Sequence, residues 1–261
     1  MQADVFIRRR SSALVFFVLL AILTVGSIAI TQYDLLRGFT SFGKALIWGA
    51  ANFYPDAGSL TNLPDIMEKL WETVLMSIAA STVAAVFSLL LAVAGSRTTR
   101  IHSSCTVIAR GIASFFRNIP LVAWAMILML AFSQGPLTGF LALFLGSFGF
   151  LTRAFMETID EVGDNAVEGL KSTGAAYYPI IFQAVLPASM PQVVSWLLFM
   201  VETNIRDATL VGLLTGTGIG FAFDVYYKSF DYHTASLVVI IIVITVLIVE
   251  TVSNSIRRVI L

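Results

Sequence analysis

Four polar residues stand close together inside an apolar stretch in the last third of the chain: Glu202, Asn204, Arg206 and Asp207. A charge at the centre of a membrane helix costs about 2.5–3.5 kcal/mol, so three unpaired charges would cost about 10 kcal/mol. These side chains must therefore face protein, water or one another. Glu202 and Arg206 are four residues apart, on one helical face and in the favoured acid-first order. Two interpretations fit them: a structural ion pair, or a polar lining of a path through the membrane.

If these residues line a path through the membrane, Arg206 is the one that would bind the transported solute. If the span begins near Gln192, Arg206 lies fourteen residues further on, about 21 Å along a helix and beyond the midpoint of a ~30 Å hydrocarbon core. A guanidinium there can bind an oxyanion through paired hydrogen bonds that an ammonium cannot reproduce. Glu202 and Asp207 would weaken its hold, because a lone cation would bind the anion too tightly to release it.

The composition indicates which elements must position these residues. The chain has 261 residues, of which 57% are hydrophobic and 12% are charged, whereas soluble domains carry about 25% charged residues. We therefore predict an all-α integral membrane protein in a lipid bilayer. The formal net charge is zero, which argues against a nucleic-acid partner because that partner would require a basic face.

The apolar stretches predict about six transmembrane helices in a single domain spanning residues 1–261. A helix needs about 20 mostly apolar residues to cross a bilayer. The stretches of suitable length are approximately 12–31, 70–95, 113–133, 136–153, 191–213 and 234–253. We interpret the first as a retained span, because its apolar run is longer than that of a signal peptide.

The distribution of lysine and arginine predicts the orientation of these spans. With the N-terminus inside, eleven basic residues lie on the inner side and four on the outer side. Both chain termini and the connection at residues 154–190 are then cytoplasmic. The outer four are Arg37, Lys44, Lys69 and Lys228; the inner ones are Arg8, Arg9, Arg10, Arg97, Arg100, Arg110, Arg117, Arg153, Lys171, Arg257 and Arg258.

The inner connection at 154–190 has a regular spacing of its own. Glu168 is followed by Gly174 after six residues, and the pair ending in Pro187 comes twelve residues later. Gly174 permits a sharp change of direction, so we predict a short helix on each side of it. Pro187 and Pro191 are predicted to separate the second of these helices from the fifth span.

Three more stretches complete a recognisable pattern. They are RNIPLVAW at 117–124, GPLTGFLAL at 135–143, and ETNIRDAT at 202–209, which is followed by GTGIG at 216–220. Together with EGLKSTGAAYYPIIFQAVLP at 168–187, they resemble the permease subunit of phosphonate-type ABC importers, a binding-protein-dependent transport inner-membrane component. The inner connection resembles the EAA loop of that family, by which the ATPase subunit grips the permease.

The resemblance implies a type I ABC-importer permease fold and a role for each stretch. The ATPase-coupling residues would be Glu168, Gly169, Thr173, Gly174, Ala175, Leu186 and Pro187. The translocation path or gate would contain Glu202, Asn204, Arg206, Asp207, Thr209, Gly216, Gly218 and Gly220. The chain would enter its third span at Arg117, Pro120 and Trp124.

The resemblance also implies the partners. These would be a cytoplasmic ABC ATPase dimer, an extracytoplasmic substrate-binding protein, and a second permease copy that is identical or closely related. The location would be the bacterial inner membrane, and the cargo phosphonate, phosphite or a related phosphorus oxyanion. The chain itself would bind no cofactor and would not be an enzyme, because ATP and Mg²⁺ would be held by the ATPase.

Other chemistries find little support in the sequence. Cys105 is the single cysteine and His102 and His233 are the two histidines, so we predict no metal site and no catalytic residues. The GTGIG stretch does not follow a strand, and we interpret it as a flexible turn at the outer mouth. We therefore expect Thr217 in this turn, and Ser133 at the end of the third span, to be reachable from outside.

Two alternative functions stay open. One is an ABC importer permease for a different small solute. The other is a channel or secondary transporter, which would need neither a coupling loop nor a delivery protein. The glycine-jointed inner connection argues against the second alternative, and so does the lack of inverted-repeat symmetry in the sequence.

Overall fold

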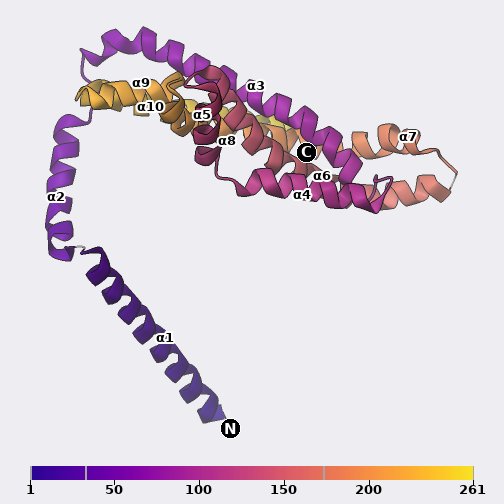
Figure 1. Ribbon diagram of the computed structural model, residues 1–261, viewed down its shortest axis with the longest axis horizontal. Coiled ribbons are helices and arrows are strands. Elements are labelled where there is room, and N and C mark those ends of the chain that lie inside the picture. The colour runs from indigo at the N-terminus through magenta and orange to yellow at the C-terminus, as the bar shows by residue number, and fades with distance from the viewer. Residues whose placement is uncertain (1, 33, 173, 261) are drawn as a thin grey trace. The chain divides into compact units, whose positions relative to one another are not determined.

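A computed structural model describes residues 2–32, 34–172 and 174–260 (Figure 1). Within these ranges the regular structure is helical, and the chain divides into two units, Met1–Phe53 and Tyr54–Leu261. Five helices are long and apolar enough to cross a membrane, or six if one bent pair of helices forms a single span. The all-α prediction with about six spans is confirmed, and the protein is a multi-pass membrane protein.

The first unit consists of two helices. Helix α1 spans Gln2–Thr31, and the apolar part of it that could cross a membrane is Ala13–Thr31. Helix α2 spans Leu35–Asn52 and begins at Asp34, whose carboxylate accepts a hydrogen bond from the Arg37 backbone N–H at 3.0 Å. An aspartate at this position satisfies one of the free N–H groups of the first helical turn.

The second unit is built around three long helices: α3 (Leu63–Gly95, after the 3₁₀ turn η1 at Ser59–Asn62), α6 (Pro136–Ser172) and α8 (Leu186–Thr215). They pack alongside one another in Figure 1. Small residues on α3 allow the close approach, since glycine, alanine and serine let helix backbones come together in membranes. The buried small residues of α3 include Ser77, Ala80, Ser81, Ala84, Ala85, Ser88 and Ala92. Helix α10 (Tyr232–Ile260) packs on this group.

The predicted third span, 113–133, is divided by a sharp bend in the structure. Helix α4 (Ser103–Asn118) and helix α5 (Leu121–Phe132) meet at 88°. Ile119 is extended, as expected of a residue before proline. The twelve residues of α5 reach only about 18 Å, less than a ~30 Å hydrocarbon core. The stretch is therefore a bent pair and not one straight helix, and the bend lies at Pro120, where the chain was expected to enter its third span.

The chain between α6 and α8 also differs from the sequence prediction. Helix α6 continues to Ser172, and α7 (Tyr177–Ile180) runs through a π-helical turn, η2 (Ile181–Val185), directly into α8. Pro187 and Pro191 lie inside this continuous helical segment and do not separate it from the fifth span. In the π turn the Leu186 N–H bonds the Ile181 carbonyl five residues back. This wider turn accommodates the missing N–H of Pro187.

A short helix, α9 (Gly218–Lys228), connects α8 to α10. Helix α8 ends at Gly216, which has a φ of +69° and donates its N–H to the Gly212 carbonyl. This is a left-handed helix ending of the kind that glycine favours. Gly218 also has a positive φ, +60°, so the chain turns back tightly from α8 into α9.

Candidate functional site

Asn204 lies in a buried hydrogen-bond network that joins three helices. Its Nδ2 donates to Ser81 Oγ on α3 at 2.8 Å and to Ser147 Oγ on α6 at 2.7 Å. Its carbonyl accepts a hydrogen bond from Ser77 Oγ at 3.1 Å. Asn204 is only 1% exposed, and it is also one of the residues that line a pocket beside α4 and α6. The geometry gives Asn204 a role in holding α3, α6 and α8 together.

Glu202 and Arg206 form the ion pair that their spacing predicts. Arg206 Nη2 lies 2.9 Å from Glu202 Oε1. The Glu202 side chain is 10% exposed and the Arg206 side chain is 48% exposed. In this pair the Glu202 carboxylate is buried, and the Arg206 side chain reaches the surface of the chain.

A third member of this group was not predicted. Arg257 on α10 places Nη2 at 3.6 Å from Glu202 Oε2, the other oxygen of the same carboxylate. No local pattern in the chain indicates this contact, because Arg257 follows Glu202 by more than fifty residues. Its place in the last turn of an apolar helix suggested only a charge at the inner membrane surface.

A pocket of about 330 Å³ lies between the α4–α5 bend, α6 and α8. It brings together two sets of residues that the sequence analysis singled out separately: Arg117 and Pro120 at the bend, and Asp207 on α8. Thr203 also lines it, and its hydroxyl is buried without a hydrogen-bond partner among the described residues. The pocket is thus lined by an arginine, an aspartate and a threonine among mainly apolar residues.

Trp124, the third residue predicted at this bend, stabilises the bend by contacts with the end of α4. Its ring stacks on Phe116 with the ring centres 5.5 Å apart. Its indole N–H donates to the Phe116 carbonyl at 3.3 Å. This hydrogen bond satisfies a carbonyl in the last turn of α4, which has no helical partner. Trp124 therefore fixes the angle between α4 and α5.

The glycine-rich turn after α8 is tightly packed, and the prediction of a flexible turn is wrong. A Cβ added at Gly220 would overlap the Thr209 carbonyl oxygen, and one added at Gly212 would overlap the Thr217 carbonyl oxygen. The glycines are needed because the backbones of α8 and α9 touch here.

The packing of this turn also decides which of its residues can be reached. Thr217 is 3% exposed and shares a 2.9 Å hydrogen bond with the Thr215 hydroxyl. The Ile219 N–H donates to Thr73 Oγ1 on α3 at 2.8 Å. Of the two residues expected to be reachable, Ser133 is exposed and Thr217 is buried.

The end of α6 and the start of α7 form a projection that we call the α6–α7 hairpin (residues 160–185). In Figure 1 it extends past the ends of α3 and α4. Gly174 has a φ of +81°, so the predicted change of direction at this glycine is present. Gly169, Gly174 and Pro187 are exposed, and Ala175 and Leu186 are half-buried. The Glu168 side chain and Thr173 lie outside the described residues.

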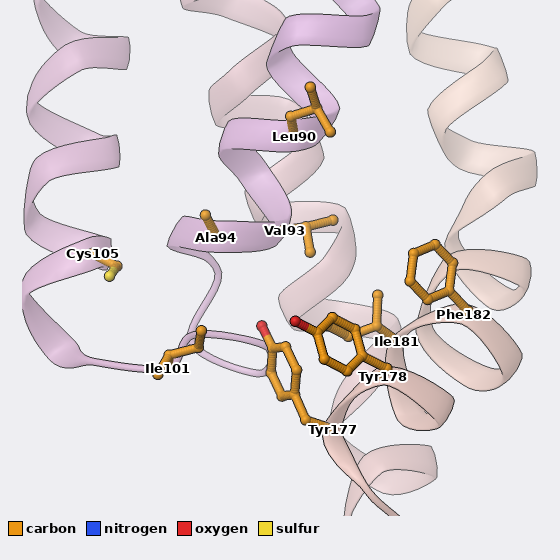
Figure 2. Close-up of a pocket in the computed structure, with 9 residues that line it drawn as sticks. All are labelled: Leu90, Val93, Ala94, Ile101, Cys105, Tyr177, Tyr178, Ile181 and Phe182. Carbon is orange, nitrogen blue, oxygen red and sulfur yellow. The ribbon is translucent and has the colours of Figure 1, made fainter.

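The second arm of this hairpin is attached to the rest of the bundle close to the turn at Gly174. Tyr177 donates its hydroxyl to the Thr99 carbonyl at 2.6 Å. An apolar pocket of about 250 Å³ adjoins this contact, lined by the end of α3 and by Ile101, Cys105, Tyr177, Tyr178, Ile181 and Phe182. Figure 2 shows Tyr177 and Tyr178 between the hairpin and the chain that follows α3. The hairpin therefore contacts α3 and α4 as well as the helices it connects.

Several helices long enough to cross a membrane, a helical hairpin between two of them and an ion pair on one of those two are the features of a multi-pass membrane protein with a polar site inside its bundle. The fold is that of a solved ABC transporter permease. A chain of the MetNI methionine ABC transporter, in an inward-facing conformation, superimposes with a TM-score of 0.66 at 20% sequence identity. That match covers 75% of this chain and 96% of the other.

The chain belongs to the family of binding-protein-dependent transport system inner membrane components, whose sequence profile matches residues 84–261. It is 30% identical over 190 residues to the phosphate-import permease protein PhnE of Mycolicibacterium smegmatis, covering 73% of this chain and 36% of that protein. It is 32% identical over 189 residues to the phosphite transport system permease protein PtxC of Stutzerimonas stutzeri, covering 72% and 69%. These relatives are transport permeases, and the resemblance found in the sequence is confirmed.

Proposed function

We propose that this chain is the membrane subunit of an ATP-driven importer for a phosphorus oxyanion such as phosphonate or phosphite. The observation that carries the proposal is Arg206, a half-exposed guanidinium on a helix that crosses the membrane. Such a group is costly in a membrane unless it serves a path or a partner. Relatives named for phosphate and phosphite support an anion of this chemistry.

The proposal includes the partners. The exposed α6–α7 hairpin with its turn at Gly174 is the docking site for a cytoplasmic ATPase dimer, which holds ATP and Mg²⁺. An extracytoplasmic binding protein delivers the solute, and a second permease copy completes the path. This permease performs no covalent chemistry. It lies in the bacterial inner membrane with both termini in the cytoplasm, an orientation supported by the distribution of lysine and arginine.

The function is tested by reconstituting the chain with its ATPase and binding protein in proteoliposomes. Uptake and ATP hydrolysis are measured with methylphosphonate, phosphite, phosphate and methionine. We expect ATP-dependent uptake of a phosphorus oxyanion. Uptake of methionine alone would support a permease for a different solute, and uptake without ATP would support a channel or secondary transporter.

The role of Arg206 is tested separately by substitution. Arg206→Lys should insert normally but transport poorly, because lysine keeps the charge and loses the paired hydrogen bonds. Arg206→Gln should lose more transport. Arg153→Lys is the matched control, since Arg153 also pairs with a glutamate four residues away, Glu157. Full uptake by a Glu202→Gln/Arg206→Gln double variant would refute the path-lining role and leave the pair as a structural contact.

A further inference from the structure

The Glu202 carboxylate is shared between two arginines from different helices. Its Oε1 is bound by Arg206 of α8 at 2.9 Å, and its Oε2 faces Arg257 of α10 at 3.6 Å. One negative charge thus stands between two positive charges. The three groups together carry a net charge of +1.

The two arginines differ in what else can neutralise them. Nε and Nη2 of Arg257 are buried and have no hydrogen-bond partner among the described residues, while Nη1 donates to Asn254 at 3.3 Å. The Arg257 side chain is 24% exposed, half as much as that of Arg206. Arg257 therefore depends on Glu202 for its counter-charge, whereas Arg206 can meet a molecule at the surface.

Two other acids lie near this arrangement. Asp207 follows Arg206 on α8, lines the pocket that Arg117 also lines, and interacts electrostatically with Arg206. Glu250 lies on α10, seven residues before Arg257, and is exposed. Within the described part of the chain, Glu202 is the acid that lies within 4.0 Å of either arginine.

We propose that Arg257 is a positioning residue that sets the charge available at Arg206. With Arg257 in place, the carboxylate of Glu202 is divided between two cations, so Arg206 keeps enough positive charge to attract an anionic solute. Without Arg257, Glu202 would neutralise Arg206 completely and the anion would meet a pair with no net charge. This inference rests on the proposed function, in which Arg206 binds the transported oxyanion.

The test compares four variants in the reconstituted complex, with KM and kcat for uptake measured separately. Arg257→Gln should raise KM for the oxyanion on the order of tenfold, since it removes one nearby charge from a poorly screened site, while kcat changes less. Arg257→Lys keeps the charge and should stay within about twofold of the wild-type KM. Glu202→Gln/Arg257→Gln restores the net charge of +1 and should recover most of the affinity. Arg258→Gln is the matched control, because this exposed neighbour carries the same charge.

The outcomes distinguish a failure of the role of Arg257 from a failure of the proposed function. If the wild-type complex imports no phosphorus oxyanion, the proposed function fails. If it does import one, but Arg257→Gln has the same KM as Arg258→Gln, the inference fails alone. A fall in kcat and in unfolding temperature at unchanged KM would show a merely structural role for Arg257, and would also refute the inference.

Discussion

Replacing Gly220 with alanine should destabilise the packing of α9 on α8. The added methyl would overlap the carbonyl oxygen of Thr209 and would lie 3.0 Å from the Leu213 backbone nitrogen. Both neighbours are backbone atoms of one helix, so neither can rotate away as a side chain could. The two helices must separate to admit the methyl group.

The size of the effect follows from two opposing contributions. Extra atoms forced into a packed interior cost about 1–3 kcal/mol, and contact with backbone places Gly220 at the upper end of that range. Alanine recovers about 1 kcal/mol through its better helix propensity. The net loss is about 2 kcal/mol, or about 4–8 °C in unfolding temperature for a domain of this size.

The measurement is thermal unfolding of the purified chain in mild detergent. Gly111→Ala is the control, because a Cβ at this position on α4 meets no atom within 4 Å, and its unfolding temperature should stay the same or rise. If Gly220→Ala unfolds at the wild-type temperature, the close approach of α8 and α9 described above is refuted.

Two further predictions concern the hairpin and the buried network. Gly174→Val should lose ATPase association and ligand-stimulated turnover while still inserting, because the φ of +81° strains a β-branched residue; Gly174→Asn, which tolerates this φ, should keep both, and equal behaviour of the two variants would contradict the reasoning. Asn204→Leu should lower stability by about 1–3 kcal/mol through the loss of two hydrogen bonds inside the membrane. Thr203→Val is its control, since that hydroxyl has no partner among the described residues, and equal unfolding temperatures for the two variants would argue against the network.

Local features of the fold could be predicted from the sequence. Apolar length predicted the spans other than the third, four-residue spacing predicted the Glu202–Arg206 pair, and a glycine between two helix-compatible stretches predicted the turn at Gly174. Each of these depends on residues close together in the chain. The physical rules that govern them need no knowledge of the neighbouring helices.

Features that depend on distant neighbours could not be predicted. The serines that bind Asn204 lie 123 and 57 residues away, and Arg257 comes from another helix. A glycine in a sequence is compatible with two different structures: a flexible backbone, or a backbone that another backbone approaches closely. At Gly220 only the position of α9 against α8 shows that the reason is close approach.

The prolines illustrate a different difficulty. Pro187 normally ends or bends a helix, and the sequence around it contains no sign of a π-helical turn. That turn depends on one extra residue in the hydrogen-bond ladder. Because of that turn the helix continues past Pro187, and residues Tyr177–Thr215 form one helical segment.

In that continuous segment the second arm of the hairpin and Arg206 belong to one helical shaft. From Tyr177 to Arg206 is about 44 Å at 1.5 Å per residue, and an axial rotation of about 20° would sweep a side chain 5–6 Å from the axis through about 2 Å. If a protein that grips the hairpin turns this shaft and thereby alters the affinity of Arg206 for an anion by some factor, the anion must alter the grip by the same factor. A bound anion would then change the affinity of the hairpin for the protein that grips it, through the same helix that this protein turns.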